Sequence, residues 1–190
     1  MHFPETSAFM LEWLKAPLIT ASIIPSSHSL ARKMVQGLPT GTQSVIELGP
    51  GTGVFTRELL NAGIREEALT LVELNTHFAN ELRKKYPKAR MINGAAESLG
   101  HFDLQKADAV VSGLPLLSMG EQQIAGMLQT VFSAMSSQGV FIQFTYGYQC
   151  PVKKALLQQH NLTAQLYGFV LNNFPPASVY HIRHHSFRDI

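Results

Sequence analysis

Short apolar runs alternate with amphipathic segments along most of the 190-residue chain. Strands are predicted over residues 44–48, 69–74, 90–92, 107–112 and 139–144. Helices with one apolar face are predicted between them, over residues 54–62, 76–85 and 120–135. Apolar strands that alternate with helices form a parallel sheet with helices on both faces, so the pattern predicts a doubly wound α/β fold.

The two ends of the chain depart from this alternation. Two helices are predicted ahead of the sheet, over residues 5–15 and 27–36. A last helix and two strand-like runs are predicted over residues 151–159, 163–170 and 178–186. The Asn-Asn-Phe-Pro-Pro turn between the two runs suits an antiparallel hairpin at a sheet edge. We therefore expect a mostly parallel seven-stranded sheet with an antiparallel C-terminal hairpin.

The first predicted strand runs into the stretch V-I-E-L-G-P-G-T-G-V, in which Gly49, Gly51 and Gly53 alternate with other residues. Such a turn lets a ligand approach bare backbone. The Gly-Lys-Ser/Thr ending of a phosphate-binding loop is missing, and Val54 stands where the dinucleotide fingerprint needs its third glycine. The motif Glu47-x-Gly49-x-Gly51-x-Gly53 instead resembles motif I of class I S-adenosylmethionine-dependent methyltransferases.

This resemblance implies the Rossmann-like fold of that class and S-adenosylmethionine as cofactor, with S-adenosylhomocysteine as product. The Glu47 carboxylate would help to hold the ammonium group of the cofactor. Glu73 ends the second predicted strand, where an acidic residue binds the ribose diol of a nucleotide. Ser26 and Ser27 would close over the methionine end of the cofactor, although capping of the following helix also explains them.

The stretch N-G-A-A-E-S follows the third predicted strand, where the class commonly places a residue beside the adenine. Ala95 and Ala96 occupy the position at which an aspartate is frequent. Their backbone amides, or the side chain of Asn93 or Glu97, are therefore the candidate adenine contacts.

The fourth predicted strand ends in V-S-G-L-P-L-L-S, where such enzymes usually meet the methyl acceptor. Nucleic-acid adenine methyltransferases resemble one another here by an Asn or Asp, one residue, a Pro and an aromatic that stacks on the flipped base. This chain has Gly113 in place of the first residue and Leu116 in place of the aromatic. Leucines in these positions favour an aliphatic acceptor over a flat nucleobase.

Four segments together resemble the bacterial phospholipid N-methyltransferases that methylate phosphatidylethanolamine. They are A-S-I-I-P-S-S-H-S-L-A-R-K-M, V-I-E-L-G-P-G-T-G-V-F-T, S-G-L-P-L-L-S and I-Q-F-T-Y-G. The resemblance extends from about Phe9 to Pro151. It implies transfer of methyl groups to the headgroup amine of phosphatidylethanolamine, in the pathway to phosphatidylcholine.

An alkyl amine acceptor sets a chemical requirement, because an ammonium group that titrates near 10 is only about one part in a thousand neutral at pH 7. We expect Leu114, Leu116 and Leu117 to disfavour the charged form by desolvation, although ordinary core packing can account for one or two of them. Backbone carbonyls near Ser112 and Gly113 would orient the nitrogen.

Tyr146 and Tyr148 follow the fifth predicted strand. Their rings would contact the methylated ammonium group, since quaternary ammonium groups favour aromatic faces, or they are buried structural tyrosines. The candidate catalytic residues are Ser112, Gly113, Leu114, Pro115 and Tyr146.

The predicted helix over residues 5–15 has an apolar stripe formed by Phe9, Met10, Trp13 and Leu14. The stripe favours either a helix that lies on a membrane or a lid packed on the sheet. Four cations are candidates for contact with lipid phosphates, namely Arg32, Lys33, Lys153 and Lys154.

We expect a single domain over residues 1–190, with residues 1–40 as a helical membrane or lid segment and residues 41–190 as the Rossmann-like core. Hydrophobic residues make up 45% and charged residues 15% of the chain, which is compatible with an apolar partner. The formal charge of +2 is too small to favour nucleic acid, and no Cys/His spacing resembles a metal site.

The single cysteine and the lack of a basic leader favour a cytoplasmic protein, peripheral on the inner face of the bacterial membrane. Three alternatives stay open at this point. They are an enzyme similar to the ribosomal RNA adenine N6-dimethyltransferases, a methyltransferase of small soluble amines, and a membrane-associated protein that binds the cofactor without catalysis.

Overall fold

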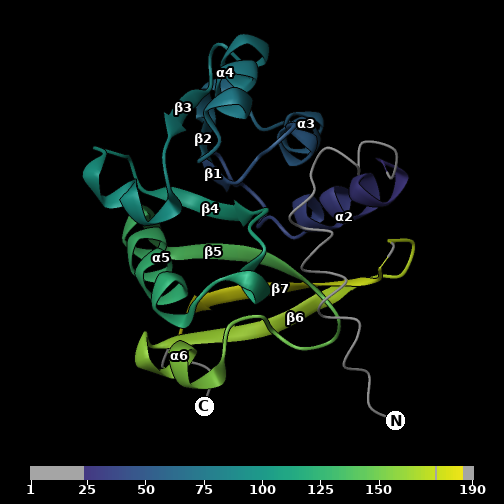
Figure 1. Cartoon of the computed structure of the whole chain (residues 1–190), viewed down its shortest axis with the longest axis vertical. Coiled ribbons are helices and arrows are strands. Elements are labelled where there is room, and N and C mark those ends of the chain that lie inside the picture. Colours follow the sequence, from purple (N-terminus) through teal and green to yellow (C-terminus); the bar gives the residue numbers. More distant parts are fainter. Residues whose placement is uncertain (1–23, 174, 186–190) are drawn as a thin grey trace.

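A seven-stranded mixed sheet forms the centre of the protein (Figure 1). The computed structural model describes residues 24–173 and 175–185, and only the backbone of residues 24–27. The strands are β1 Val45–Leu48, β2 Leu69–Glu73, β3 Arg90–Asn93, β4 Ala107–Ser112, β5 Met135–Tyr146, β6 Leu162–Val170 and β7 Ala177–His184. Their order is β3-β2-β1-β4-β5-β7-β6. The first five pair in parallel, while β7 is antiparallel to β5 and β6, so the expected fold class is confirmed.

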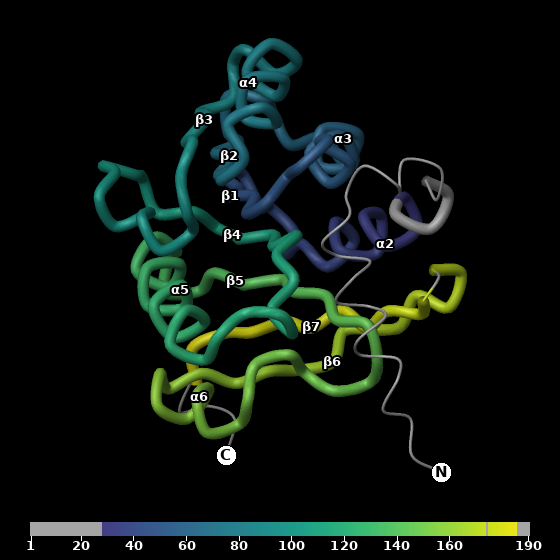
Figure 2. The backbone as a smooth tube through the Cα atoms, in the orientation of Figure 1, coloured from purple at the N-terminus to yellow at the C-terminus, as the bar shows by residue number. Residues whose placement is uncertain are grey.

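Helices cover both faces of this sheet (Figures 1 and 2). One face, called here the α2 face, is covered by α2 Ile24–Gln36, α3 Val54–Asn61 and α4 Thr76–Lys85. The other, called the α5 face, is covered by the short 3-10 helix η3 Ala96–His101, by α5 Glu121–Ala134 and by α6 Lys154–Gln159. Two further 3-10 turns are η2 Glu66–Ala68 and η4 Leu116–Ser118.

Alternating side chains of the strands supply the two cores. In β1, Val45 joins the core on the α2 face and Ile46 joins the core on the α5 face. In β5, Ile142 joins the core on the α2 face and Phe141 joins the core on the α5 face. Because helices cover both sides, most positions of these two strands are buried and the buried side chains are mainly apolar, as expected of a parallel sheet. A buried polar residue in such a strand therefore requires a specific partner.

Most element boundaries lie within a few residues of their predicted positions. The helix α4 begins at Thr76 as predicted because the side chain of Asn75 accepts hydrogen bonds from the backbone amides of His77 and Phe78. The strand β5 begins at Met135, earlier than the predicted residue 139, where its pairing with β4 contains an irregularity in register.

Two sequence predictions fall outside the described residues, namely the helix over 5–15 and the membrane stripe of Phe9, Met10, Trp13 and Leu14. Within the described ranges, no helix is both long enough and apolar enough to span a bilayer. The division of the chain into a segment over 1–40 and a core over 41–190 stays a prediction.

Parallel pairing brings the carboxyl ends of β1, β2, β4 and β5 to one edge of the sheet. The amino ends meet at the opposite edge, where Asp108 of β4 joins the start of β1. Its Oδ2 atom accepts hydrogen bonds from the backbone amides of Gln43 at 2.8 Å and Ser44 at 2.9 Å, and from the Ser44 hydroxyl at 3.1 Å. These bonds lower the pKa of Asp108 below its ordinary value of 3.8.

We expect the substitution Asp108→Ala to lower the free energy of unfolding by about 1–3 kcal/mol, because it leaves the amides of Gln43 and Ser44 without an acceptor. Since the folded pKa lies below the unfolded one, the carboxylate stabilises the protein above pH 3.8 and the effect is lost as pH falls through the folded pKa. Denaturant unfolding at pH 7 and pH 3 measures this. The exposed Asp103→Ala is the control, and equal losses in both variants would contradict the role.

Candidate cofactor and acceptor site

Three glycines shape the loop between β1 and α3 at the carboxyl edge of the sheet. Gly49, Gly51 and Gly53 all have positive φ, at 65°, 53° and 80°. The Gly49 amide donates to the carbonyl of Val72 at 2.9 Å, and the Gly53 amide donates to the carbonyl of Pro50 at 2.8 Å. Residues with a β carbon rarely adopt such angles, which explains the glycine at each alternate position.

Glu73 lies beside this loop, at the end of β2 as predicted. Its Oε2 accepts a hydrogen bond from the Gly51 amide at 3.0 Å, and its Oε1 accepts one from the Asn75 amide at 2.8 Å. Because each carboxylate oxygen has a further lone pair, these bonds leave capacity for a diol. Glu73 thus holds the glycine loop in place as well as standing at the predicted ribose position.

Glu47 is fully buried in β1, beneath the glycine loop on the α2 face. The Thr56 hydroxyl of α3 donates to its Oε2 at 2.7 Å, and Oε1 has no hydrogen-bond partner among the described residues. Burial, with a smaller contribution from the charge of Glu73, raises the pKa of Glu47 to about 8. A buried acceptor without a partner matches the ammonium group that the sequence motif implies, because a cation would supply both the hydrogen bond and the opposite charge.

The loop after β4, residues 113–118 and called here the acceptor loop, packs directly on the glycine loop. The Gly113 amide donates to the carbonyl of Leu48 at 2.8 Å. A β carbon at residue 113 would lie 2.7 Å from the Gly49 carbonyl oxygen, and one at Gly49 would lie 2.9 Å from Cδ2 of Leu114. Position 113 therefore has no room for the Asn or Asp that adenine methyltransferases place there.

Gln143 of β5 holds this acceptor loop, and the sequence analysis did not identify it. Its side chain is fully buried, and its Nε2 donates to the carbonyls of Leu114 at 3.0 Å and Phe144 at 2.8 Å. The Leu114 carbonyl also accepts from the Leu116 amide at 3.0 Å, and the Ser112 hydroxyl accepts from the Leu114 amide at 3.2 Å. The available signal was a glutamine inside an otherwise apolar run.

The three leucines of the acceptor loop have different environments. Leu116 is buried in the core on the α5 face, so the expectation that it desolvates the acceptor is corrected in favour of core packing. Leu117 is exposed to solvent and does not enclose a site in this structure. Leu114 alone lies between the two loops, where its side chain reaches Gly49. Pro115 ends the loop with its carbonyl bonded to the amide and hydroxyl of Ser118.

The two tyrosines after β5 also differ. Tyr146 is half-buried with its ring edge-on to Phe144 at 5.3 Å, and burial raises its pKa to about 12. Its hydroxyl therefore stays protonated at neutral pH and cannot serve as a base. Tyr148 is exposed, and its ring contacts Phe169 edge-on at 5.8 Å.

The candidate adenine contacts are partly occupied by the fold itself. Ala96 belongs to the core of the α5 face, and its carbonyl accepts a hydrogen bond from Thr130. The Asn93 side chain donates to the carbonyls of Glu73 at 2.8 Å and Leu74 at 3.2 Å. Ala95 and Glu97 are half-buried near the same edge, and the backbone amides of Ala95 and Ala96 and the side chain of Glu97 stay candidates. The side chains of Ser26 and Ser27 lie outside the described part of the structure.

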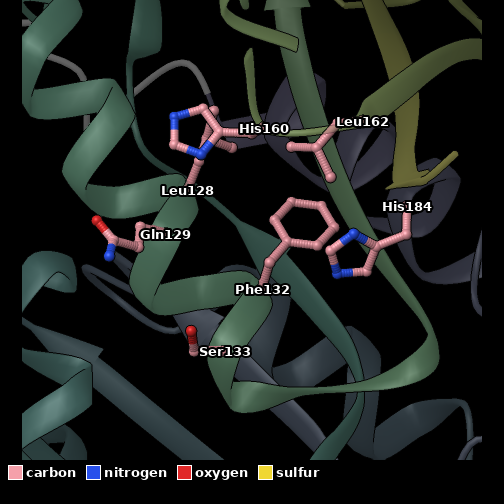
Figure 3. A pocket seen from close by; sticks show the side chains of 7 residues that line it. All are labelled: Leu128, Gln129, Phe132, Ser133, His160, Leu162 and His184. Carbon is pink, nitrogen blue, oxygen red and sulfur yellow. The ribbon is translucent and has the colours of Figure 1, made fainter. Parts of the chain in front are cut away.

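A cavity of about 230 Å³ lies away from this site, between α5 and the ends of β6 and β7 (Figure 3). It is lined by Leu128, Gln129, Phe132, Ser133, His160, Leu162 and His184. The ring of Phe132 contacts His184 at 5.0 Å, so the two histidines do not share a ligand position. No group of three or more metal-binding side chains occurs among the residues that the structure describes.

Comparison with known proteins identifies the class. A family model for a methyltransferase domain matches residues 45–139, which contain the glycine loop, Glu73 and the acceptor loop. The chain belongs to this family and is a class I methyltransferase that depends on S-adenosylmethionine. Solved structures agree in fold: the glycopeptide N-methyltransferase MtfA, solved with S-adenosylmethionine, has a TM-score of 0.62 at 14% identity over 83% of this chain and 86% of its own.

Two curated relatives differ in how much of the chain they match. An ornithine lipid N-methyltransferase of Singulisphaera acidiphila is 26% identical over 183 residues, which is 92% of this chain and 94% of the relative. A ribosomal RNA small subunit methyltransferase A of Maridesulfovibrio salexigens is 45% identical over 64 residues, which is 33% of this chain and 24% of the relative. The similarity to the lipid enzyme thus extends over nearly the whole length of both sequences.

The substitution Glu47→Gln tests the role of the buried carboxyl. Because the folded pKa of about 8 exceeds the ordinary 4.5, the contribution of Glu47 to the stability of the cofactor-free protein is greatest below pH 4.5 and is lost as pH rises through 8. The variant lacks this loss, so we expect it to be more stable than the unmodified protein near pH 8 but to bind the cofactor at least about tenfold more weakly.

Thermal unfolding across pH and calorimetric titration with S-adenosylmethionine provide the two readouts. The exposed Glu67→Gln, which removes a surface ion pair with Lys88, is the control and should leave cofactor affinity unchanged. Unchanged cofactor affinity in Glu47→Gln would refute the contact with the ammonium group.

The substitution Gln143→Met tests the support of the acceptor loop, because methionine fills a similar volume without a donor. Loss of one hydrogen bond to Leu114 should speed amide hydrogen exchange in residues 113–118 by about tenfold. Cofactor affinity should change by less than about twofold, since Gln143 does not contact the glycine loop. The exposed Gln129→Met is the control, and unchanged exchange in Gln143→Met would show that the loop does not depend on this bond.

Proposed function

We propose that the protein transfers methyl groups from S-adenosylmethionine to the headgroup amine of phosphatidylethanolamine at a membrane surface. The observation that carries this proposal is the contact of Gly113 and Leu114 with Gly49. It brings an apolar loop against the cofactor loop and leaves no space for a polar clamp on a nucleobase. The full-length similarity to a lipid N-methyltransferase supports an amine on a lipid.

The reaction requires little of the protein beyond positioning the amine against the methyl donor and excluding water from it. S-adenosylmethionine supplies an electrophilic methyl group, and attack by the amine lone pair displaces S-adenosylhomocysteine, with the carbon–sulfur bond electrons kept by sulfur. The amine must first lose a proton, which costs roughly 4 kcal/mol at pH 7 for a group that titrates near 10. The side chain of Leu114 favours the neutral amine by excluding water from the attacking nitrogen.

Backbone groups orient the amine. The Leu114 carbonyl is occupied by the Leu116 amide and by Gln143, whereas no hydrogen bond to the Gly113 carbonyl occurs among the described residues. We assign the Gly113 carbonyl as the acceptor that aligns an N–H of the neutral amine, so that its lone pair points towards the glycine loop. Tyr146, which stays protonated, offers a ring at the same edge for the methylated product.

An ornithine headgroup is a second candidate acceptor, because the relative that spans 92% of this chain is an ornithine lipid N-methyltransferase. Both headgroups present a primary alkyl amine on a diacyl lipid. The site as described would contact the amine and its apolar surroundings, which the two lipids share. The cytoplasmic location, on the inner face of the membrane, and membrane contact through the stripe around Trp13 belong to the same proposal.

Methyl transfer from labelled S-adenosylmethionine tests the proposed function, with four acceptors offered separately. These are detergent-dispersed phosphatidylethanolamine, detergent-dispersed ornithine lipid, ribosomal RNA and a panel of soluble amines. We expect label in a lipid headgroup. Label in RNA or in a soluble amine alone would refute the lipid assignment, and cofactor binding without transfer to any acceptor would refute catalysis.

Two glycine variants make the assay specific for the site. Gly49 and Gly63 both have positive φ, so alanine strains the backbone at each. A β carbon at Gly49 meets Leu114 at 2.9 Å, whereas one at Gly63 has nothing within 4 Å. We expect Gly49→Ala to reduce transfer by more than about a hundredfold and Gly63→Ala to retain it. Equal activities would contradict the packing of the two loops as the basis of the site.

A further inference from the structure

An exposed apolar surface is formed by the C-terminal hairpin and the loop after β5, at the same edge of the sheet as the acceptor loop. It is formed by Tyr148, Leu166, Phe169 and Leu171, called here the hairpin patch. Their exposed fractions are 75%, 39%, 46% and 73%. Because β7 is antiparallel to β5, the turn that follows β6 lies beside the carboxyl end of β5, as Figure 1 shows for the β6–β7 turn near α2.

Direct contacts connect the hairpin patch to the acceptor loop. Gln143, which holds the Leu114 carbonyl, is paired with Tyr180 across β5 and β7. The Tyr180 hydroxyl donates to the carbonyl of Tyr148 at 2.6 Å, and the Tyr148 ring contacts Phe169. Paired residues on neighbouring strands point to the same face, so these contacts connect the hairpin patch to the acceptor loop on the α5 face of the sheet.

The charge around the hairpin patch has one sign. No Asp or Glu occurs between Glu12 and Glu47 or between Glu121 and Asp189, so α2, α6 and the whole of β5, β6 and β7 contain no acidic residue. From the other side of the edge strand, Lys33 of α2 lies 4.6 Å above the Tyr167 ring.

Exposed Arg32 lies next to Lys33 on the same helix. The acidic residues of the described chain belong to the strands, helices and loops between residues 47 and 121, among them Glu58 of α3, whose carboxylate lies 3.6 Å from His28 of α2. An apolar surface bordered by cations and free of carboxylates is complementary to an anionic bilayer, in which acyl chains lie beneath phosphate groups.

We propose that the hairpin patch inserts into the interfacial region of an anionic phospholipid bilayer and so holds the acceptor loop against the headgroups. This inference rests on the proposed function, because it assumes that the acceptor is a lipid. Tyr148 and Phe169 are suited to the interface, where aromatic rings lie between headgroups and acyl chains. Leu171, at the tip of the hairpin, reaches deepest, while Arg32 and Lys33 contact phosphates.

Binding to vesicles of phosphatidylglycerol and phosphatidylcholine tests the surface without any methyl acceptor in the membrane. We expect the double variant Phe169→Ser/Leu171→Ser to bind about tenfold more weakly, because two exposed apolar side chains no longer leave water. Leu171→Glu, a change in an exposed turn that leaves the core intact, should weaken binding to a similar degree through repulsion. Binding of the unmodified protein should fall with added salt.

The control is Phe102→Ser, which removes an exposed aromatic of 37% exposure that precedes β4, at the opposite edge of the sheet. It should bind as the unmodified protein does. Equal binding by the hairpin variants and by this control would overturn the proposal. Circular dichroism and thermal unfolding establish that each variant is folded.

Residues 1–23 of the chain itself are the other possible occupant of the hairpin patch. Trp13 is the single tryptophan, so its fluorescence reports on that segment. Unchanged emission of the hairpin variants without vesicles supports a free surface, and a clear shift would show that the segment covers it and would overturn the proposal.

Transfer to detergent-dispersed phosphatidylethanolamine separates this inference from the proposed function. The hairpin variants should keep that activity and lose activity on vesicles. If the variants still bind vesicles and the protein methylates a lipid, the membrane-binding role of the hairpin patch is refuted and the proposed function is not. Weakened vesicle binding without methylation of any lipid would refute the proposed function and leave the surface assigned.

Discussion

The structure depends on the contact between two loops at the carboxyl edge of the sheet. Gly49 and Gly113 approach so closely that neither tolerates a side chain, and the hydrogen bond from Gly113 to Leu48 fixes their separation. The order of the strands, with β4 directly beside β1, places the cofactor loop and the acceptor loop on neighbouring strands. This arrangement converts a two-molecule reaction into one between groups held side by side, which is the main source of rate that such a site can provide.

Two buried polar side chains show where stability is given up for that arrangement. Among the described residues, neither the Oε1 of Glu47 nor the Oε1 of Gln143 has a hydrogen-bond partner, although both side chains are fully buried, and the pKa of Glu47 is raised to about 8. Each unsatisfied group costs free energy that an apolar residue would not. Both lie directly beneath the two loops, one on each face of the sheet. The central strands β1 and β5 therefore supply the buried polar side chains that support the site, while the two loops supply mainly backbone groups.

Local signals in the sequence were enough to predict the fold. The apolar runs predicted the strands and the antiparallel hairpin, and the amphipathic pattern predicted the start of α4 at Thr76, where Asn75 caps the helix. The glycine motif and Glu73 were predicted for the same reason, since each is a short-range pattern at the end of a strand. Thr56 and Gln143 were not, because their roles depend on residues that are brought close only by folding. For Leu116, desolvation of the acceptor and core packing were both left open, because a run of leucines does not indicate which one turns into the core.

The position of the hairpin relative to the site follows from topology as well. A parallel seventh strand would have needed a long crossover, whereas the antiparallel β7 returns through a short turn that projects past the carboxyl edge. Because the acidic residues of the described part of the chain lie between β1 and the start of α5, this projecting turn carries no acidic group; its described residues are Leu171, Asn172, Asn173, Pro175 and Pro176. Cofactor binding and surface contact are thereby assigned to different halves of one sheet, and the Gln143–Tyr180 pair is where the two halves meet.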